Sequence, residues 1–182
     1  MNPLLDFSGL PRFADFKPEH VAPAMSRLLG EVREITKQVT EDKSEPTWDT
    51  FVLPLDDAIE RLRRAWGQVA HLNAVMNSAE LRKVYNESLP LVTELFTELA
   101  QNESLFRRYK ALSESAGFAA LSPAQRKFIQ NELRDFRLGG ADLAPRKKVE
   151  VGKTAQELAK LSSRFHDIVL DESNAFELLV KD

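Results

Sequence analysis

Apolar residues recur at steps of three and four along most of this chain, a spacing that places them on one face of an α-helix. In the first such segment the steps join Val21, Met25, Leu28, Val32 and Ile35. Comparable patterns predict helices over about residues 18–40, 47–76, 77–99, 103–112, 122–139 and 145–171. Only a few residues separate the second and third segments, so these helices should be antiparallel neighbours. The sequence therefore predicts an all-α fold, an antiparallel, bundle-like array of about six helices.

The fifth segment has the clearest boundary signals. Ser122 precedes Pro123, and Gln125 follows at the position that completes a capping box. Gly139 and Gly140 predict a left-handed stop at its end. The sixth segment begins after Pro145. Its apolar seam contains the following residues: Leu158, Leu161, Phe165, Ile168 and Val169.

Both ends of the chain differ from these helices. Residues 1–17 contain prolines and glycine among apolar residues, which predicts an extended arm laid across a surface. Alternation at Phe176, Leu178 and Val180 fits one short strand in the tail, residues 175–182. With residues 18–174 helical, we expect a single helical domain over residues 1–182.

Charge and composition narrow the class of protein. The 25 basic and 28 acidic residues give a net charge of −3, too balanced for a nucleic-acid or membrane-surface partner. No segment approaches the run of about 20 apolar residues that a membrane helix needs. The chain lacks cysteine, and its first 13 residues lack the basic leader of a signal peptide. We expect a cytoplasmic protein.

The sequence offers no catalytic constellation. Its three histidines, His20, His71 and His166, are far apart, and none has the His or Glu partner of a helical zinc motif. A metal-using enzyme remains an alternative only if these three converge. No serine lies in a Gly-x-Ser-x-Gly elbow. Four aromatic residues on helical seams are interpreted as core packing: Trp48, Trp66, Phe96 and Phe136.

A series of short motifs extends along nearly the whole chain. In order they are Leu10-Pro11-Arg12-Phe13, Lys17-Pro18-Glu19-His20-Val21, Pro46-Thr47-Trp48-Asp49, Leu62-Arg63-Arg64-Ala65-Trp66, residues 71–78 and Leu133-Arg134-Asp135-Phe136-Arg137-Leu138. Their order and spacing resemble the beginning of the thimet-oligopeptidase family of zinc metallopeptidases. The resemblance implies a non-catalytic N-terminal helical region, because the family's His-Glu-x-x-His zinc motif lies downstream of the part matched here.

The same resemblance implies how the region works. Members of the family have a helix-rich body split by a deep channel that admits short peptides, and this region would form scaffold and channel wall. No catalytic or metal residue carries over, and zinc is implied only for the full-length protein. The expected partners are the downstream catalytic part or a second copy of the chain. The alternative is a stand-alone helical interaction module without catalysis.

Three polar residues beside the second apolar seam are candidates for facing such a channel: His71, Asn73 and Asn77. The competing interpretation is that they are exposed residues that cap and flank a helix.

Overall fold

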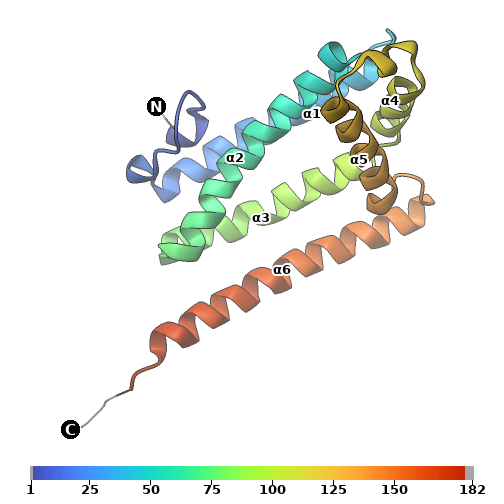
Figure 1. The fold of residues 1–182 in the computed structure, drawn as a ribbon. Coiled ribbons are helices and arrows are strands. Elements are labelled where there is room, and N and C mark those ends of the chain that lie inside the picture. Colours follow the sequence, from blue (N-terminus) through green and yellow to red (C-terminus); the bar gives the residue numbers. More distant parts are fainter. Residues whose placement is uncertain (1, 179–182) are drawn as a thin grey trace.

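The computed structural model describes residues 2–178 and is built from six α-helices, with no strand in that range. The helices are α1 (Val21–Glu41), α2 (Leu53–Val75), α3 (Ala79–Ala100), α4 (Glu103–Glu114), α5 (Pro123–Gly139) and α6 (Pro145–Ala175). Short helical turns lie at Pro3–Leu5, Phe13–Asp15, Pro18–His20, Trp48–Val52 and Ala116–Ala120. The helices α1, α2 and α3 alternate in direction, and α6 runs opposite to α3 (Figure 1), so the predicted all-α, antiparallel array is confirmed.

The core lies between α1, α2 and α3 and continues to α4 and α5 at one end of the molecule (Figure 1). Phe51, in the turn before α2, is fully buried, and its ring meets Tyr109 of α4 with 4.7 Å between centroids. Tyr109 in turn contacts Phe136 of α5 at 5.6 Å. Because these aromatic side chains bury large apolar areas, they fix the α4–α5 pair onto the three-helix layer.

The boundary signals of α5 act as predicted. The Ser122 side chain accepts a hydrogen bond from the Gln125 backbone, and the Gln125 side chain accepts one from the Ser122 backbone. Gly140 has a φ of 91°, a left-handed conformation that only glycine adopts without strain. A Cβ atom added at Gly139 would lie 2.7 Å from the Cβ atom of Ala100, so this glycine lets the C-terminal ends of α5 and α3 approach closely.

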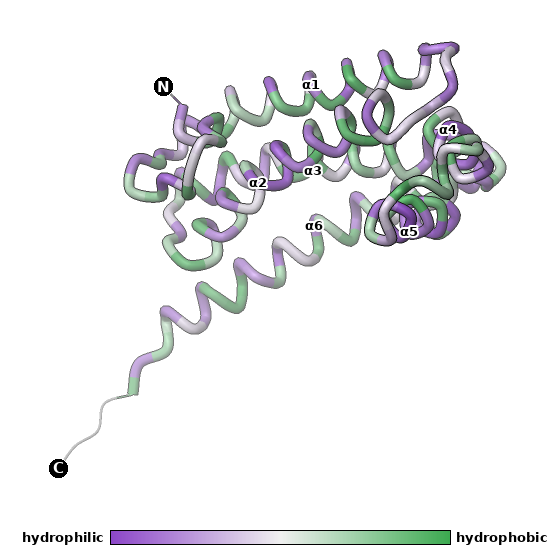
Figure 2. Tube along the Cα trace, turned by 45° about the horizontal axis from the view of Figure 1, so that its top comes forward, coloured by the Kyte–Doolittle hydropathy of each residue, from purple (hydrophilic) through white to green (hydrophobic). Residues whose placement is uncertain are grey.

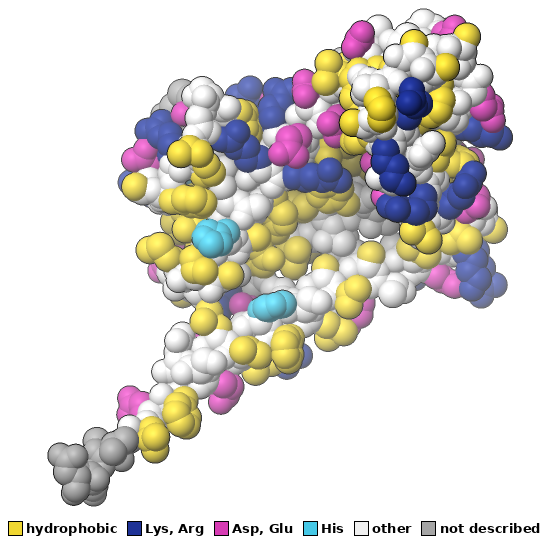
Figure 3. Space-filling view, viewed as in Figure 1, with side chains coloured by type: hydrophobic (Ala, Val, Ile, Leu, Met, Phe, Trp, Pro, Cys, Tyr) yellow, Lys and Arg dark blue, Asp and Glu magenta, His cyan; other side chains and the backbone are white. Residues whose placement is uncertain are grey.

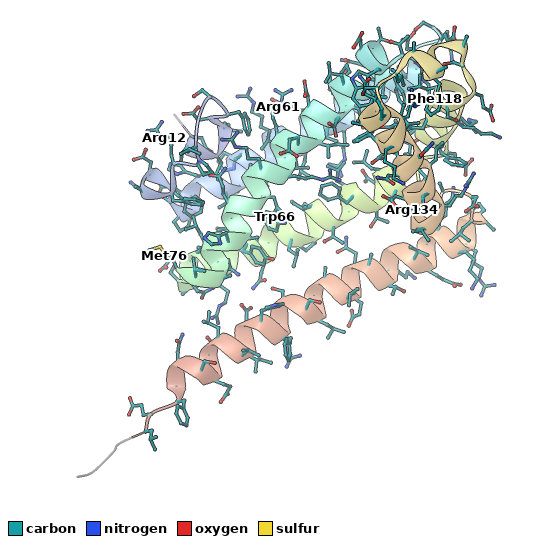
Figure 4. All side chains as sticks on the ribbon, in the orientation of Figure 1. Arg12, Arg61, Trp66, Met76, Phe118 and Arg134 are labelled. Atoms are coloured by element: carbon teal, nitrogen blue, oxygen red, sulfur yellow. The ribbon has the colours of Figure 1, made fainter. Side chains whose placement is uncertain are left out.

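The aromatic residues assigned to the core are less uniform than expected. Phe136 is buried, whereas Trp48, Trp66 and Phe96 are half-buried against the core. Trp66 lies on the side of α2 that faces α3 (Figure 4), where its ring stacks on Tyr85 with 4.9 Å between centroids and planes only 7° apart.

Two predictions about the chain ends need correction. The arm is not simply extended, since it contains the turns at Pro3–Leu5 and Phe13–Asp15. It does lie on the helices, with Leu4 buried and the Asn2 side chain donating to the His20 carbonyl at 2.8 Å. The predicted tail strand is wrong for residues 176–178, where no neighbouring strand offers backbone partners. Its remaining residues lie outside the described range.

The largest departure from the helical pattern concerns α6. An amphipathic helix normally turns its apolar face towards the core. Here no residue of α6 is buried, and its apolar seam is exposed. Figure 2 shows α6 along one side of the layer formed by α1, α2 and α3, with hydrophobic positions recurring along its length.

Candidate functional surface

The surface with the most distinctive chemistry lies between α3 and α6. At one end, Arg82 of α3 donates two hydrogen bonds to the carboxylate of Asp171, at 2.8 and 2.7 Å. Asp167, one turn earlier on α6, lies 3.4 Å from the same guanidinium. The hydrogen bond from Arg82 lowers the pKa of Asp171. This fork geometry fixes the orientation of both helices at that end.

Polar contacts also join the start of α6 to the connection between α3 and α4, and the middle of α6 to α3. The Gln101 side chain donates to the Lys148 carbonyl at 3.0 Å, and the Lys148 ammonium pairs with Glu103 and lowers the pKa of that carboxyl. Between the ends, Ser163 donates to Asn86 at 2.8 Å. Hydrogen bonds and ion pairs therefore tie α6 to α3 and to the start of α4 at both ends and in the middle.

A groove of about 950 Å³ follows this contact. Residues from α3 and α6 line it, among them Pro90, Thr97, Gly152, Gln156, Ala159 and Ser163. A second pocket of about 520 Å³ continues towards α2 and is lined by Asn73, Tyr85 and His166, among others. Figure 3 shows the hollow between α6 and the body of the protein.

The structure separates the three predicted channel residues. Asn73 lines the second pocket, and Asn77 donates to both the backbone and side-chain oxygens of Asn73 at 2.9 Å. Arg82 donates to Asn77 at 3.1 Å and so joins this pair to the clamp on α6. His71 is exposed elsewhere and contacts the Phe13 ring at 5.7 Å. Only two of the three residues thus come together.

The groove residues on α6 escaped the sequence analysis, although they follow a pattern. Half-buried positions on α6 recur at helical spacing, and most are small or polar: Gly152, Gln156, Ala159, Ser163 and Asp167. Analysis of apolar periodicity passes over such a stripe, because it scores the opposite face of the same helix.

The histidines do not form a common site. His20 Nδ1 accepts from the Lys17 backbone at 3.1 Å, while His166 Nδ1 lies 2.7 Å from the Ser162 carbonyl. Within residues 2–178, no group of three His, Asp or Glu side chains is placed to hold one metal ion. A zinc ion with three or four protein ligands does not fit the donor sets present there.

Two partly buried carboxyls lie near Tyr109 between α2, α4 and α5. Burial raises the pKa of Glu132 and also that of Asp56, which is the less buried of the two carboxyls. The nearby Arg63 opposes both shifts. Burial and the two carboxyls also raise the pKa of Tyr109. The adjoining cavity of about 180 Å³ is small and lined largely by core residues such as Leu55 and Leu99. These acids belong to the packing of the bundle.

No helix within the described part of the chain is long and apolar enough to cross a bilayer.

Comparison with known proteins gives the class of this helical array. A family model described as the N-terminal domain of neurolysin/thimet oligopeptidase matches residues 24–148. The chain belongs to this family, and the resemblance inferred from the short motifs is confirmed.

Several individual relatives are called oligopeptidase A. The chain is 43% identical to oligopeptidase A of Haemophilus influenzae over 181 residues, which cover 100% of this chain and 26% of that protein. Identity to oligopeptidase A of Escherichia coli is 38%, again over 100% of this chain and 27% of the relative. A probable cytosolic oligopeptidase A of Arabidopsis thaliana is 34% identical, with 100% and 26% covered. The chain spans about a quarter of the length of these relatives.

Proposed function

We propose that this chain is the non-catalytic N-terminal helical region of an oligopeptidase A, a peptidase that hydrolyses short peptides. Two observations carry the proposal: the whole chain aligns with only 26% of an oligopeptidase A, and residues 24–148 match the N-terminal domain of the family. In this role the three-helix layer serves as scaffold, and the α3–α6 surface forms part of the wall of the peptide channel.

The metal chemistry would belong to the remaining three quarters of the parent. Family resemblance implies a zinc ion there, which would activate water for peptide hydrolysis. The donor sets of residues 2–178 do not fit such an ion, so this region would contribute shape and support. Its partners are the downstream catalytic part and, within the channel, short peptides.

The Asn73–Asn77 pair is the best candidate for a channel-facing element. Both amides lie beside the pocket that joins α2, α3 and α6, and amides can hydrogen-bond the backbone of a peptide in either direction. His71 is a weaker candidate, because its ring lies against Phe13 of the arm. We also propose a cytoplasmic location. It is supported by the name of one relative, the probable cytosolic oligopeptidase A of Arabidopsis thaliana.

The test is a chimera. In oligopeptidase A of Haemophilus influenzae, the matched N-terminal segment is replaced by this chain, and hydrolysis of an internally quenched oligopeptide is measured. We expect the chimera to hydrolyse the peptide. The same enzyme without its N-terminal segment, and this chain alone, should be inactive.

Two results would contradict the proposal. A folded, zinc-loaded chimera without activity would show that this region cannot replace the scaffold of its relative. Peptide hydrolysis by the isolated chain that is lost on chelation would show that the region is itself catalytic. A chimera with Asn73→Ala and Asn77→Ala tests the channel-facing role of these residues. If the two amides bind the peptide, their loss should raise KM more than it lowers kcat.

A further inference from the structure

The helix α6 packs on α3 through its small and polar face, whereas a core helix packs through its apolar face. Most of the half-buried positions of α6 carry small or polar side chains, and a Cβ atom added at Gly152 would lie 3.6 Å from the Thr97 side chain, an ordinary van der Waals distance. With 3.6 residues per turn, this stripe is centred on the side of α6 opposite its apolar seam. Figure 4 shows side chains of α6 projecting both towards α3 and away from it.

The seam forms what we term the outward face of α6: Leu158, Leu161, Phe165, Ile168 and Val169. These five side chains are 47–65% exposed. Hydrophobic side chains follow the lower edge of α6 in Figure 3, on the side away from the hollow. Apolar patches of this extent on a helix are typical of a surface that another protein segment covers.

The family match indicates which segment that is. The part of the chain that matches the N-terminal domain ends at residue 148, only three residues after α6 begins at Pro145. Most of α6 therefore lies beyond that domain. A turn at residues 140–144, with left-handed Gly140 at its start, separates α6 from the rest.

We propose that α6 is the first helix of the next body of the peptidase, and that downstream chain of the same protein covers its outward face. The partner surface is apolar and helical, with knobs that fit the ridge of Leu161, Phe165 and Ile168. The α3–α6 contact is then a contact between two bodies, which fits the hydrogen bonds and ion pairs found along it. This inference rests on the proposed function, since it requires a longer parent.

The experiment compares one pair of substitutions in two settings. Leu161→Ser with Phe165→Ser is introduced into the isolated chain and into the chimera described above. Leu91→Ser is the matched control, because Leu91 of α3 is 48% exposed and lies outside the outward face. Thermal midpoints are measured for both settings, with peptide hydrolysis for the chimera.

We expect the double variant to leave the midpoint of the isolated chain unchanged within error, because the face is exposed there. In the chimera it should lower the midpoint by several degrees and reduce the yield of active enzyme, because buried apolar contacts are lost. The Leu91→Ser control should change neither. Equal destabilisation in both settings, or no effect in the chimera, would overturn the assignment.

Light scattering on the isolated chain keeps the two proposals separable. A stable dimer that dissociates on Leu161→Ser with Phe165→Ser, but not on Leu91→Ser, would assign the face to a second copy and overturn the inference. If the unchanged chimera is itself inactive, the proposed function fails. The thermal midpoint of the folded but inactive chimera then still decides the α6 assignment: it stands if the double variant lowers that midpoint and leaves the isolated chain unchanged, and it falls otherwise.

Discussion

Replacing Trp66 by alanine tests how α2 and α3 are held together. Truncating a fully buried Trp or Phe to alanine typically lowers the free energy of unfolding by about 3–5 kcal/mol. Trp66 is half-buried, so we expect a smaller transfer and cavity contribution of about 2 kcal/mol. Loss of the stacked contact with Tyr85, at 4.9 Å and 7°, adds roughly 1 kcal/mol. The expected total is about 3 kcal/mol, which lowers the thermal midpoint by roughly 6–12 °C for a chain of this size.

The assay is urea unfolding followed by far-ultraviolet circular dichroism. A double-mutant cycle with Tyr85→Ala isolates the stacking energy, expected at about 0.5–1.5 kcal/mol. Leu91→Ala, at an exposed site, should change stability by less than about 0.5 kcal/mol. An unchanged midpoint for Trp66→Ala, or a coupling of zero with Tyr85, would refute the reasoning, because either result means that the two rings do not pack in solution.

Three further predictions test local features of the bundle. Ser122→Ala should destabilise by about 1 kcal/mol in urea unfolding, because the capping box at the start of α5 is lost; Ser122→Asp should retain most of that stability. Gly140→Ala should cost about 1–2 kcal/mol in the same assay, since an alanine at a φ of 91° is strained; a neutral result would place the turn after α5 in another conformation. Glu132→Gln should alter the pH dependence of unfolding. Burial raises the pKa of Glu132, so the folded state holds its proton more tightly, and stability falls as pH rises above the unfolded value near 4.5. The glutamine variant should be flatter over that range, and identical profiles would argue that Glu132 is solvated.

Local sequence patterns predict much of the fold. The three-and-four spacing of apolar residues suffices for six helices, because a helical face repeats every 3.6 residues whatever it packs against. Ser122 and Gly140 predicted the ends of α5 correctly, since capping and left-handed stops depend on a few adjacent residues. The family was also recognisable from short motifs, because their order along the chain survives divergence.

The candidate site was only partly predictable. Asn73 and Asn77 are four residues apart at the end of α2, so their pairing is a local event that sequence analysis approached. Arg82 connects this pair to Asp171, which lies 89 positions beyond Arg82, and that connection depends on how α6 is placed. His71 was grouped with the two asparagines by proximity in sequence, yet the helix directs it to Phe13 of the arm.

The sequence by itself determined that α6 is an amphipathic helix, since periodicity is a property of one segment. Only the tertiary structure decided which face of α6 meets the bundle. Arg82 and Asn86 of α3, and Gln101 just after it, offer hydrogen-bond partners to α6, so the small and polar stripe of α6 turns inward. The apolar seam is left outside. The sequence of a helix shows which of its faces is apolar. Where that face points depends on which other segments of the chain pack against the helix.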